Sequence, residues 1–414
     1  MKTEKVFHND RYLKSLDATV LDVISKKDRI EIITDRTIFF AEGGGQPGDR
    51  GAMYLTEDET KHVDIYDTHD SGESVAHYTN SEHVPFNVGD KVTMELDWTF
   101  RFSNMQRHYG EHILSGAIYK LYRGTNRGFH MGHNYITIDI DLDGKIMDTA
   151  MLEAAETLAN EAVWADMPIQ AHCFNSVEEA NAMPLRKAVN EKVEGSVVIV
   201  TVGDPADPFD CCACCGTYPS TSGQIGIIKI FKAESNKGMT RLYFDCGRNA
   251  LVHYQELHRI LTDVAERFSS KPEDLIRTLD KRDKEESELK AERAHLAEYF
   301  RTAEATALAL CAAAPNDKLV YRAYSDISPN ELQKLGFKAL DLIERDNKPL
   351  LALACSPSGT LMLVSDGSYP CGKLVKENVK EYGGKGGGRA DNARAQFDND
   401  DDLKAFVGAI AQKL

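Results

Sequence analysis

The chain lacks the segments that would direct it into or across a membrane. Its 414 residues contain no apolar run that approaches the roughly 18 residues of a membrane span. The first residues, Met1 to Lys5, have no apolar core of the kind found in a secretory signal. We therefore expect a cytoplasmic protein with no membrane partner.

A disulfide framework is also absent. The nine cysteines are odd in number, and four of them cluster in the run Cys211-Cys212-Ala213-Cys214-Cys215. Small secreted domains instead carry an even number of spaced cysteines that pair with one another. The cluster favours a reduced compartment and thiols that bind a metal.

Positive charge is scarce. The 49 Lys and Arg residues are outnumbered by 65 Asp and Glu residues, which gives a formal net charge of −16. This balance argues against a general nucleic-acid-binding protein. It leaves room for local basic patches, because affinity for nucleic acid follows the individual phosphate contacts.

Two common catalytic motifs are missing. Five glycines fall between Gly43 and Gly51, which indicates positive φ angles, close backbone approach or simply a flexible hairpin. No Gly-Lys-Ser/Thr follows them, so this stretch is not the phosphate loop of nucleotide-binding proteins. No Gly-x-Ser-x-Gly occurs either, which removes the serine nucleophile of that motif.

What the sequence does contain is half of a metal site. His108 and His112 lie four residues apart in a segment whose apolar spacing predicts a helix over 99–122. On a helix such a pair shares one face, with Cβ atoms roughly 5–6 Å apart, although many such pairs are ordinary helix surface. The clustered cysteines follow a predicted buried strand over 196–202. Imidazole with thiolate suits zinc.

The number of thiolates decides the kind of site. Two histidines with one cysteine and an open position form a catalytic arrangement, whereas two histidines with two cysteines form a closed structural site. Glu111 lies between the histidines but does not follow the first one as in His-Glu-x-x-His. We therefore expect Glu111 to lie behind the ligands or at the surface.

The pattern of elements predicts an α+β protein in four parts. Residues 1–90 alternate as short strands and are expected to form a β-barrel-like domain. Residues 91–248 are expected to form an α/β domain with a central antiparallel sheet that carries the metal site. The charged residues 249–305 predict a helical linker, either a solvated hairpin or a dimerising coiled coil. Residues 306–414 predict a compact α/β domain.

A second glycine-rich segment lies in the last part, between Gly383 and Gln396. Its five glycines accompany Lys385, Arg389 and Arg394. Backbone amides and cations of this kind favour a site for an anion or for RNA phosphate. The alternative is a tight turn with ordinary solubilising charges.

Four segments, taken in order, resemble the alanyl-tRNA editing family, which comprises the editing domain of alanyl-tRNA synthetase and its free-standing relatives. Residues 37–51 resemble the family's T-x-F-Y-x-E-x-G-G-Q-x-G-D-x-G loop. Residues 96–115 resemble D-W-x-x-R-x-x-x-M-x-x-H-T-x-x-H-L-L-S, and residues 214–226 resemble C-x-G-T-H-V-x-x-T-G-E-I-G. Residues 383–396 resemble the C-terminal domain shared by alanyl-tRNA synthetases and DHH-type phosphoesterases. The match covers nearly the whole chain.

The resemblance implies hydrolysis of misacylated tRNA(Ala), mainly Ser-tRNA(Ala) and also Gly-tRNA(Ala). A synthetase pocket built for alanine discriminates poorly against small near-isosteres, so a second, hydrolytic site is needed. We expect that no adenylation domain precedes residue 1, so the resemblance implies a long-form, free-standing and ATP-independent editor. Residues 91–248 would be its editing domain and residues 306–414 its tRNA-binding domain. A homodimer would form through residues 250–305 or through the C-terminal domain.

The resemblance also assigns metal ligands. His108, His112 and Cys214 match family ligands, and the implied ion is Zn²⁺. The fourth family ligand, a histidine, falls on Tyr218, which is a poor zinc ligand because its unperturbed pKa is near ~10. Cys211, Cys212 or Cys215 would then complete the site, or water would, or metal binding would be weakened. The family's threonine after the first histidine is Tyr109 here.

Substrate contacts are implied in the same way. Thr37 and Gln46 match residues of the amino-acid pocket, where we expect Thr37 to bind the serine hydroxyl and Gln46 to hold the substrate. The backbone amides of Gly43, Gly44 and Gly45 would stabilise an oxyanion. The basic residues of the C-terminal segment would contact tRNA; they are Lys385, Arg389 and Arg394.

Two other functions remain open. One is a non-catalytic zinc-containing tRNA-binding protein, which the departure at Tyr218 allows. The other is a phosphoesterase, against which the absence of an Asp-His-His motif argues.

Overall fold

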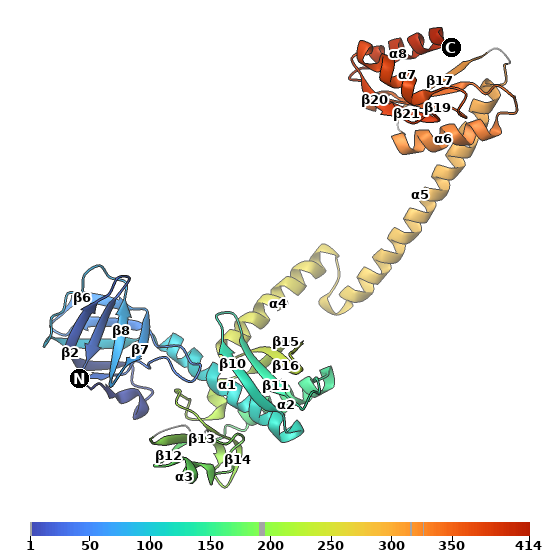
Figure 1. Ribbon diagram of the computed structural model, residues 1–414. Coiled ribbons are helices and arrows are strands. Elements are labelled where there is room, and N and C mark those ends of the chain that lie inside the picture. Colours follow the sequence, from blue (N-terminus) through green and yellow to red (C-terminus); the bar gives the residue numbers. More distant parts are fainter. Residues whose placement is uncertain (1, 190–194, 315–316, 326) are drawn as a thin grey trace. The chain divides into compact units, whose positions relative to one another are not determined.

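The computed structural model describes residues 2–189, 195–314, 317–325 and 327–414 (Figure 1). The chain is an α+β protein that divides into two compact units, Met1–Val264 and Ala265–Leu414. The finer division into four parts stays a prediction. Among the described residues, no helix is both long and apolar enough to span a membrane.

The N-terminal unit begins with a seven-stranded antiparallel sheet in the order β6-β5-β9-β2-β3-β8-β7. β2 pairs with two strands. Its first half pairs with β9, and its second half, from Val20 onward, pairs with β3, with a bulge directly after Val20. Apolar side chains such as Val20, Ile32 and Met94 fill the core on one side of the strands. The strands are β2 (Ser15–Ser25), β3 (Ile30–Thr34), β5 (Gly51–Leu55), β6 (Asp58–Ile65), β7 (Asp67–Ser71), β8 (Ser74–Thr79) and β9 (Lys91–Leu96).

A short parallel pair holds the start of the chain. β1 (Glu4–Lys5) pairs with β4 (Arg36–Thr37), and the 3₁₀ turn η1 (Val6–His8) follows β1. The glycine-rich loop lies between β4 and β5. The loop is therefore anchored at both ends in the N-terminal strands.

The long helix α1 (Trp98–Tyr122) carries the histidine pair, as the apolar spacing predicts. Asp97 caps its first turn by accepting a hydrogen bond from the Phe100 amide, which satisfies an otherwise unpaired donor. Arg123 ends the helix in a left-handed conformation. Residues from Met105 to Ile118 are almost all buried, which means that other elements cover several faces of this helix.

A four-stranded sheet in the order β10-β11-β16-β15 packs against α1 and α2 (Thr149–Trp164). Its strands are antiparallel throughout. β15 begins at Ile228, because Ser222–Ile225 form the 3₁₀ turn η2 and Gly226 has a φ of +86°. The strands are β10 (Thr125–Met131), β11 (Ile136–Asp141), β15 (Ile228–Asn236) and β16 (Met239–Cys246).

A three-stranded antiparallel sheet carries the cysteine cluster. Its order is β12 (Ile169–Phe174), β13 (Val197–Asp204) and β14 (Asp207–Ala213), and the short helix α3 (Val177–Asn181) packs on it. β14 ends at Ala213, so Cys211 and Cys212 are strand residues and Cys214 and Cys215 belong to the following loop. The N-terminal unit ends within α4 (Gly247–Arg267).

The C-terminal unit contains a five-stranded sheet in the order β17-β18-β19-β21-β20, with only the β17–β18 pair parallel among these strands. Alternate residues of β18 enter two cores: Leu350 faces the core with α7 and α8, and Leu351 faces the core with α5 and α6. The strands are β17 (Leu319–Tyr324), β18 (Leu350–Cys355), β19 (Thr360–Val364), β20 (Lys385–Gly388) and β21 (Asn392–Gln396). The helices are α5 (Leu275–Cys311), α6 (Pro329–Leu342), α7 (Cys371–Asn378) and α8 (Asp400–Lys413).

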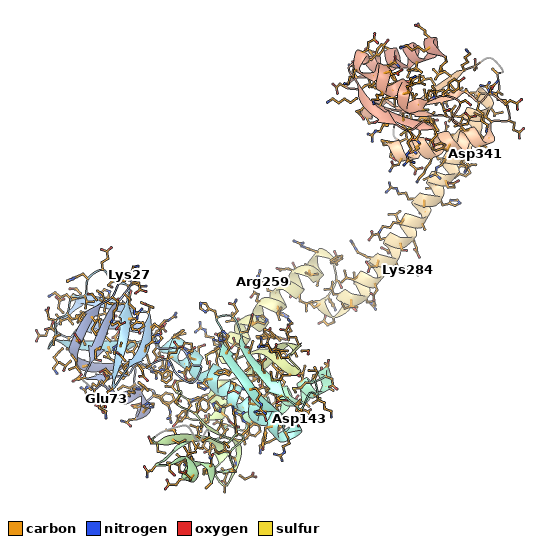
Figure 2. The ribbon with its side chains drawn as sticks, in the orientation of Figure 1. Lys27, Glu73, Asp143, Arg259, Lys284 and Asp341 are labelled. Atoms are coloured by element: carbon orange, nitrogen blue, oxygen red, sulfur yellow. The ribbon has the colours of Figure 1, made fainter. Side chains whose placement is uncertain are left out.

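The helix α5 exposes most of its length. Lys284, labelled in Figure 2, is exposed and forms an ion pair with Glu288 on the same helix. Leu289, Leu296 and Tyr299 are exposed on the same helix. The short 3₁₀ turns η3 (Pro272–Asp274), η4 (Ser356–Ser358) and η5 (Val379–Tyr382) complete the unit.

Candidate active site

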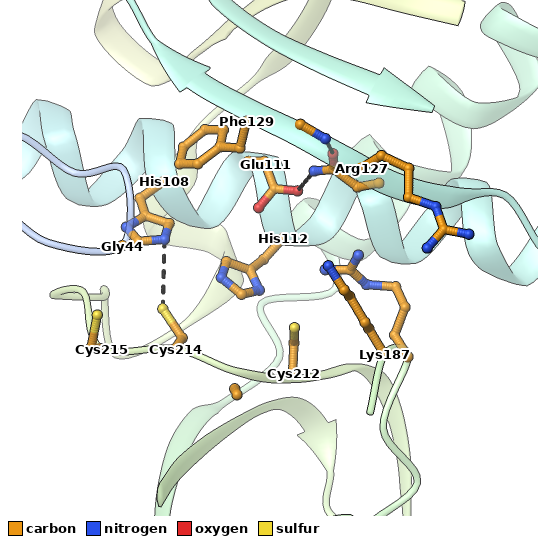
Figure 3. Close-up of a pocket in the computed structure, with 14 residues that line it drawn as sticks. Gly44, His108, Glu111, His112, Arg127, Phe129, Lys187, Cys212, Cys214 and Cys215 are labelled. Carbon is orange, nitrogen blue, oxygen red and sulfur yellow. Dashed lines mark hydrogen bonds between the residues drawn. The ribbon is translucent and has the colours of Figure 1, made fainter. Parts of the chain in front are cut away.

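Three predicted ligands converge at the middle of α1. His108 and His112 lie on one face of the helix with ring centroids 5.3 Å apart. Cys214 comes from the loop after β14, and its Sγ lies 3.5 Å from His108 Nε2 (Figure 3). Potential ligand atoms of the three side chains all lie within 4.8 Å of one another. The structure therefore brings together residues that are 106 positions apart in the sequence.

Gln46 orients His108 from behind. Its Oε1 lies 3.1 Å from His108 Nδ1 and accepts a hydrogen bond of 3.0 Å from the Thr217 amide, while its Nε2 donates to Thr217 Oγ1 over 2.7 Å. Because Oε1 can only accept, His108 carries a proton on Nδ1, which leaves Nε2, the atom that faces Cys214, as the position that can bind a metal. The structure thus places Gln46 on His108, and not on the wall of the pocket as the resemblance implied.

Asp210 orients His112 in the same way as Gln46 orients His108. Its Oδ2 lies 3.1 Å from His112 Nδ1, and its Oδ1 accepts a hydrogen bond of 2.7 Å from Arg186 Nε. Burial raises the pKa of Asp210, but Arg186 and His112 outweigh burial and hold it at about 2. A carboxylate behind a histidine is typical of metal ligands. Sequence reasoning missed Asp210 and Arg186; the signal for Asp210 was its position directly before the cysteine cluster.

Cys214 has the environment of a thiolate. Burial raises the pKa of its thiol, but His108 and His112 outweigh burial and lower it well below its usual value. Burial likewise lowers the pKa of His112, but Cys214 and Asp210 raise it well above its usual value. Without a metal, the site therefore favours a thiolate beside a charged imidazole.

The prediction that Cys211 completes the ligand set does not hold in this geometry. Consecutive residues of β14 point to opposite sides, so Cys211 packs with Val197 and Ile199 while Cys212 lines the pocket. Burial raises the pKa of Cys211 to about 11, which disfavours the thiolate that a metal needs. Cys215 also lines the pocket, but it is not within reach of the three ligands as a group.

The two aromatic departures from the family motif contact each other. The rings of Tyr109 and Tyr218 lie 5.3 Å apart, and Arg11 lies 3.6 Å over the ring of Tyr218. Tyr218 is not part of the ligand group. Tyr109 is fully buried and stacks on His112 at 4.8 Å. Burial, and then the adjacent Cys214, raise the pKa of its hydroxyl well above the usual value.

The glycine turn packs onto this centre. Gly43 and Gln46 pair with each other at 3.0 and 3.1 Å, and Gly44 and Gly45 between them have φ angles of +58° and +81°. Two positive φ angles in succession form the tight hairpin turn that glycine favours. A Cβ on Gly45 would lie 2.7 Å from the Phe129 ring. Glycine is therefore required here for both backbone angle and space.

Thr37 lies inside the N-terminal strands. The resemblance instead implied that its hydroxyl contacts the substrate. Its hydroxyl is fully buried, lies 2.8 Å from His77 Nε2 and accepts from the Phe39 amide over 3.0 Å. His77 Nδ1 donates to the Ile32 carbonyl, so Nε2 is the acceptor for the Thr37 hydroxyl. Thr37 does not line the pocket, and its hydrogen bonds are already used.

The three ligands open onto a cavity of about 320 Å³. The glycine turn contributes Gly44, and Phe129 lies beside His108. Glu111 also lines the cavity, which corrects the expectation that it lies at the surface or behind the ligands. Arg127 and Lys187 lie together at one end, at the right in Figure 3.

The basic residues of the C-terminal segment are all exposed. Lys385 begins β20, Arg389 lies between β20 and β21, and Arg394 lies in β21. Within the part of the chain that the structure describes, none of the three forms an ion pair. Their charges are therefore available to a partner.

Comparisons with known proteins identify the family. The chain is 30% identical to the alanyl-tRNA editing protein AlaX-L of Pyrococcus horikoshii over 95% of each chain. The chain belongs to the alanyl-tRNA editing family. Residues 197–243 match the second additional domain of threonyl- and alanyl-tRNA synthetases, residues 9–100 match class II (A) tRNA synthetases, and residues 316–414 match the DHHA1 domain. Membership makes this chain a deacylase of misacylated tRNA(Ala).

The editing family also includes parts of larger enzymes. The alanine–tRNA ligases of Pyrobaculum neutrophilum and Pyrococcus abyssi are 30% and 25% identical to this chain over its whole length. The match spans 44% of each ligase. A segment similar to this whole chain therefore also occurs within longer alanine–tRNA ligases.

Proposed function

We propose that the cavity beside His108, His112 and Cys214 is the deacylation site and that it removes serine, and also glycine, from tRNA(Ala). The convergence of the three side chains on a cavity with basic residues at one end carries this proposal. The ligands lie on the inner wall, where an ester would react. The basic end suits the phosphates of the tRNA 3′ terminus.

The residues present fit Zn²⁺. Two imidazoles and one thiolate are its usual ligands, and Gln46 and Asp210 fix the proton of each histidine on Nδ1. The buried Tyr109 hydroxyl lies next to Cys214, on the same side of the site as this ligand. When bound, zinc would act as a Lewis acid toward the ester or toward water.

The other side chains have positioning roles in this proposal. Gln46 holds His108, and Asp210 with Arg186 holds His112. The backbone amides of Gly44 and Gly45 are suitable donors to a developing oxyanion because the turn packs against the cavity. Thr37 is left out, because its hydroxyl is committed to His77.

The C-terminal unit would hold the tRNA. Lys385, Arg389 and Arg394 offer three exposed charges on neighbouring backbone segments, which supports phosphate contacts. Binding there would raise the effective concentration of the ester at the deacylation site. The exposed apolar side chains of α5 support a homodimer through this helix, and we place the protein in the cytoplasm with the rest of translation.

Deacylation rates with Ser-tRNA(Ala), Gly-tRNA(Ala) and Ala-tRNA(Ala) test the proposal. We expect the protein to hydrolyse the first two selectively and to contain about one zinc per chain. His108→Ala should lower the rate by roughly 100-fold or more, a loss typical of essential catalytic groups. His62→Ala, at an exposed histidine of β6, is the matched control.

Two results would contradict the proposal. Full activity of His108→Ala would remove the metal site from the reaction. Binding of tRNA(Ala) without selective loss of serine or glycine would instead favour a non-catalytic zinc-containing tRNA-binding protein.

A further inference from the structure

Glu111 is the acidic side chain among the described residues that line the cavity. It extends from α1 between the two histidine ligands and points into the same space (Figure 3). It does not belong to the group of potential metal ligands. Its place in the cavity is therefore not explained by the metal site.

One oxygen of this carboxylate is fixed and the other is free. Oε1 accepts hydrogen bonds from Ser115 Oγ at 2.5 Å and from Asn126 Nδ2 at 2.7 Å. No donor among the described residues reaches Oε2, although Glu111 is only 5% exposed. Because Glu111 lines the cavity, Oε2 can accept a hydrogen bond from a ligand there, or pair with its positive charge, in place of water. The arrangement is that of a preformed acceptor for a ligand.

The charges around Glu111 restrict what that ligand group can be. His112 and Arg186 are the cationic neighbours of Glu111, but His112 is a metal ligand and Arg186 is hydrogen bonded to Asp210. Arg127 and Lys187 lie at the end of the cavity that suits phosphate. A phosphate or a carboxylate of the substrate would be repelled by Glu111. The α-ammonium group of the esterified amino acid is the cation that every aminoacyl-tRNA carries, and it lies next to the ester carbonyl.

We propose that Glu111 Oε2 binds the α-ammonium group of the aminoacyl ester, with Ser115 and Asn126 positioning the carboxylate. This inference rests on the proposed location of the deacylation site. Glu111 then selects for an unblocked amino acid, whichever side chain that amino acid carries. Esters in which the amino group is acylated or replaced by a hydroxyl are poor substrates.

The test compares two substrates that differ only in this group. Seryl-tRNA(Ala) carries the ammonium, and glyceryl-tRNA(Ala) carries a hydroxyl in its place. We expect Glu111→Gln to lower kcat/KM for the seryl ester by roughly 10- to 100-fold, as expected for a hydrogen bond to a charged group. The glyceryl ester should change by less than about threefold, because it has no charge to lose. The intrinsic reactivity of each ester cancels in the ratio of variant to wild type.

Two variants serve as controls. Glu42→Gln removes an exposed carboxylate that precedes the glycine turn and should leave both substrates unchanged. Asn126→Ala removes one donor to Oε1 but keeps the carboxylate, so it should give a smaller loss that is again confined to the seryl ester. If Glu111→Gln does not fold, as judged by its unfolding midpoint and zinc content, Asn126→Ala decides by the same criterion.

Three outcomes would overturn the proposal or its basis. An equal loss on both esters would assign Glu111 a structural role only. No loss on either ester would remove it from substrate binding. Unchanged deacylation by His108→Ala would instead show that the reaction takes place elsewhere, which is a failure of the proposed site and not of the ammonium contact alone.

Discussion

The two glycine-rich segments of this chain are similar in glycine content, but their polar side chains are buried in one segment and exposed in the other. In residues 37–51 the polar side chains of Thr37, Gln46 and Asp49 are all fully buried and hydrogen bonded inside the protein. In residues 383–396 Lys385 lies on the edge strand β20, Arg389 in the turn after it and Arg394 on the neighbouring strand β21, and all three are exposed. Glycine permits close packing in both segments, at Gly45 against the Phe129 ring and at Gly386 against the Arg394 carbonyl, so the two segments differ in where their polar side chains lie. Glycine content alone therefore does not indicate a contact with substrate.

The first and largest expected effect comes from the buried ion pair of the N-terminal segment. Asp49 Oδ2 accepts from Arg101 Nε at 2.7 Å and from the Phe40 amide at 2.6 Å, and both charged side chains are fully buried. Asp49→Ala leaves the Arg101 charge unpaired, so we expect a loss of about 3–5 kcal/mol in the free energy of unfolding. Urea unfolding measures it. Asp70→Ala, which removes an exposed pair with Lys5, should cost less than about 1 kcal/mol.

The second effect is a pH dependence of stability that His77 introduces. Burial lowers the pKa of His77 to about 4, below its ordinary 6.5. As the pH falls, the unfolded chain therefore takes up this proton before the folded protein does. Between these values the unfolded state binds more protons, and stability falls as the pH falls. We expect a loss of about 3 kcal/mol between pH 7 and pH 4, from 1.36 kcal/mol per pKa unit. His77→Gln should flatten this part of the profile, and an unchanged profile would contradict a neutral, buried His77.

The third effect separates a positioning role of Gln46 from substrate binding. Gln46→Ala removes the acceptor behind His108 Nδ1, so metal affinity should fall by roughly 10- to 100-fold. Competition with a chelator measures the affinity directly, without activity. Gln170→Ala, at an exposed position of β12, should leave it unchanged. A change in KM with unaltered metal affinity would instead indicate that Gln46 contacts the substrate.

Local sequence signals predicted the elements that carry the site. The spacing of His108 and His112 placed both on one face of α1, and Asp97 marks the start of that helix. The strand before the cysteines and the α+β class also follow from local patterns. These features depend on neighbouring residues, which is why one sequence suffices to predict them.

Local sequence patterns could not predict the contacts between distant segments. Gln46 and Thr217 are 171 positions apart, and His112 and Asp210 are 98 apart. Periodicity does not say which buried side chain meets which. Cys211 was misplaced for a local reason: we treated it as a loop residue, whereas β14 continues through it and turns its side chain away from Cys212.

The fourth prediction concerns the C-terminal segment. We expect the smallest effect on stability there, together with a clear effect on tRNA binding. Arg389→Ala and Arg394→Ala should each change the free energy of unfolding by less than about 0.5 kcal/mol, because neither side chain is buried. Each should lower the slope of log affinity for tRNA(Ala) against log salt by about 1, since each phosphate contact releases bound counterions. Lys404→Ala, which removes a cation already paired with Asp400, should leave that slope unchanged. Equal slopes for all three variants and the wild type would show that Arg389 and Arg394 do not contact the phosphates of the tRNA.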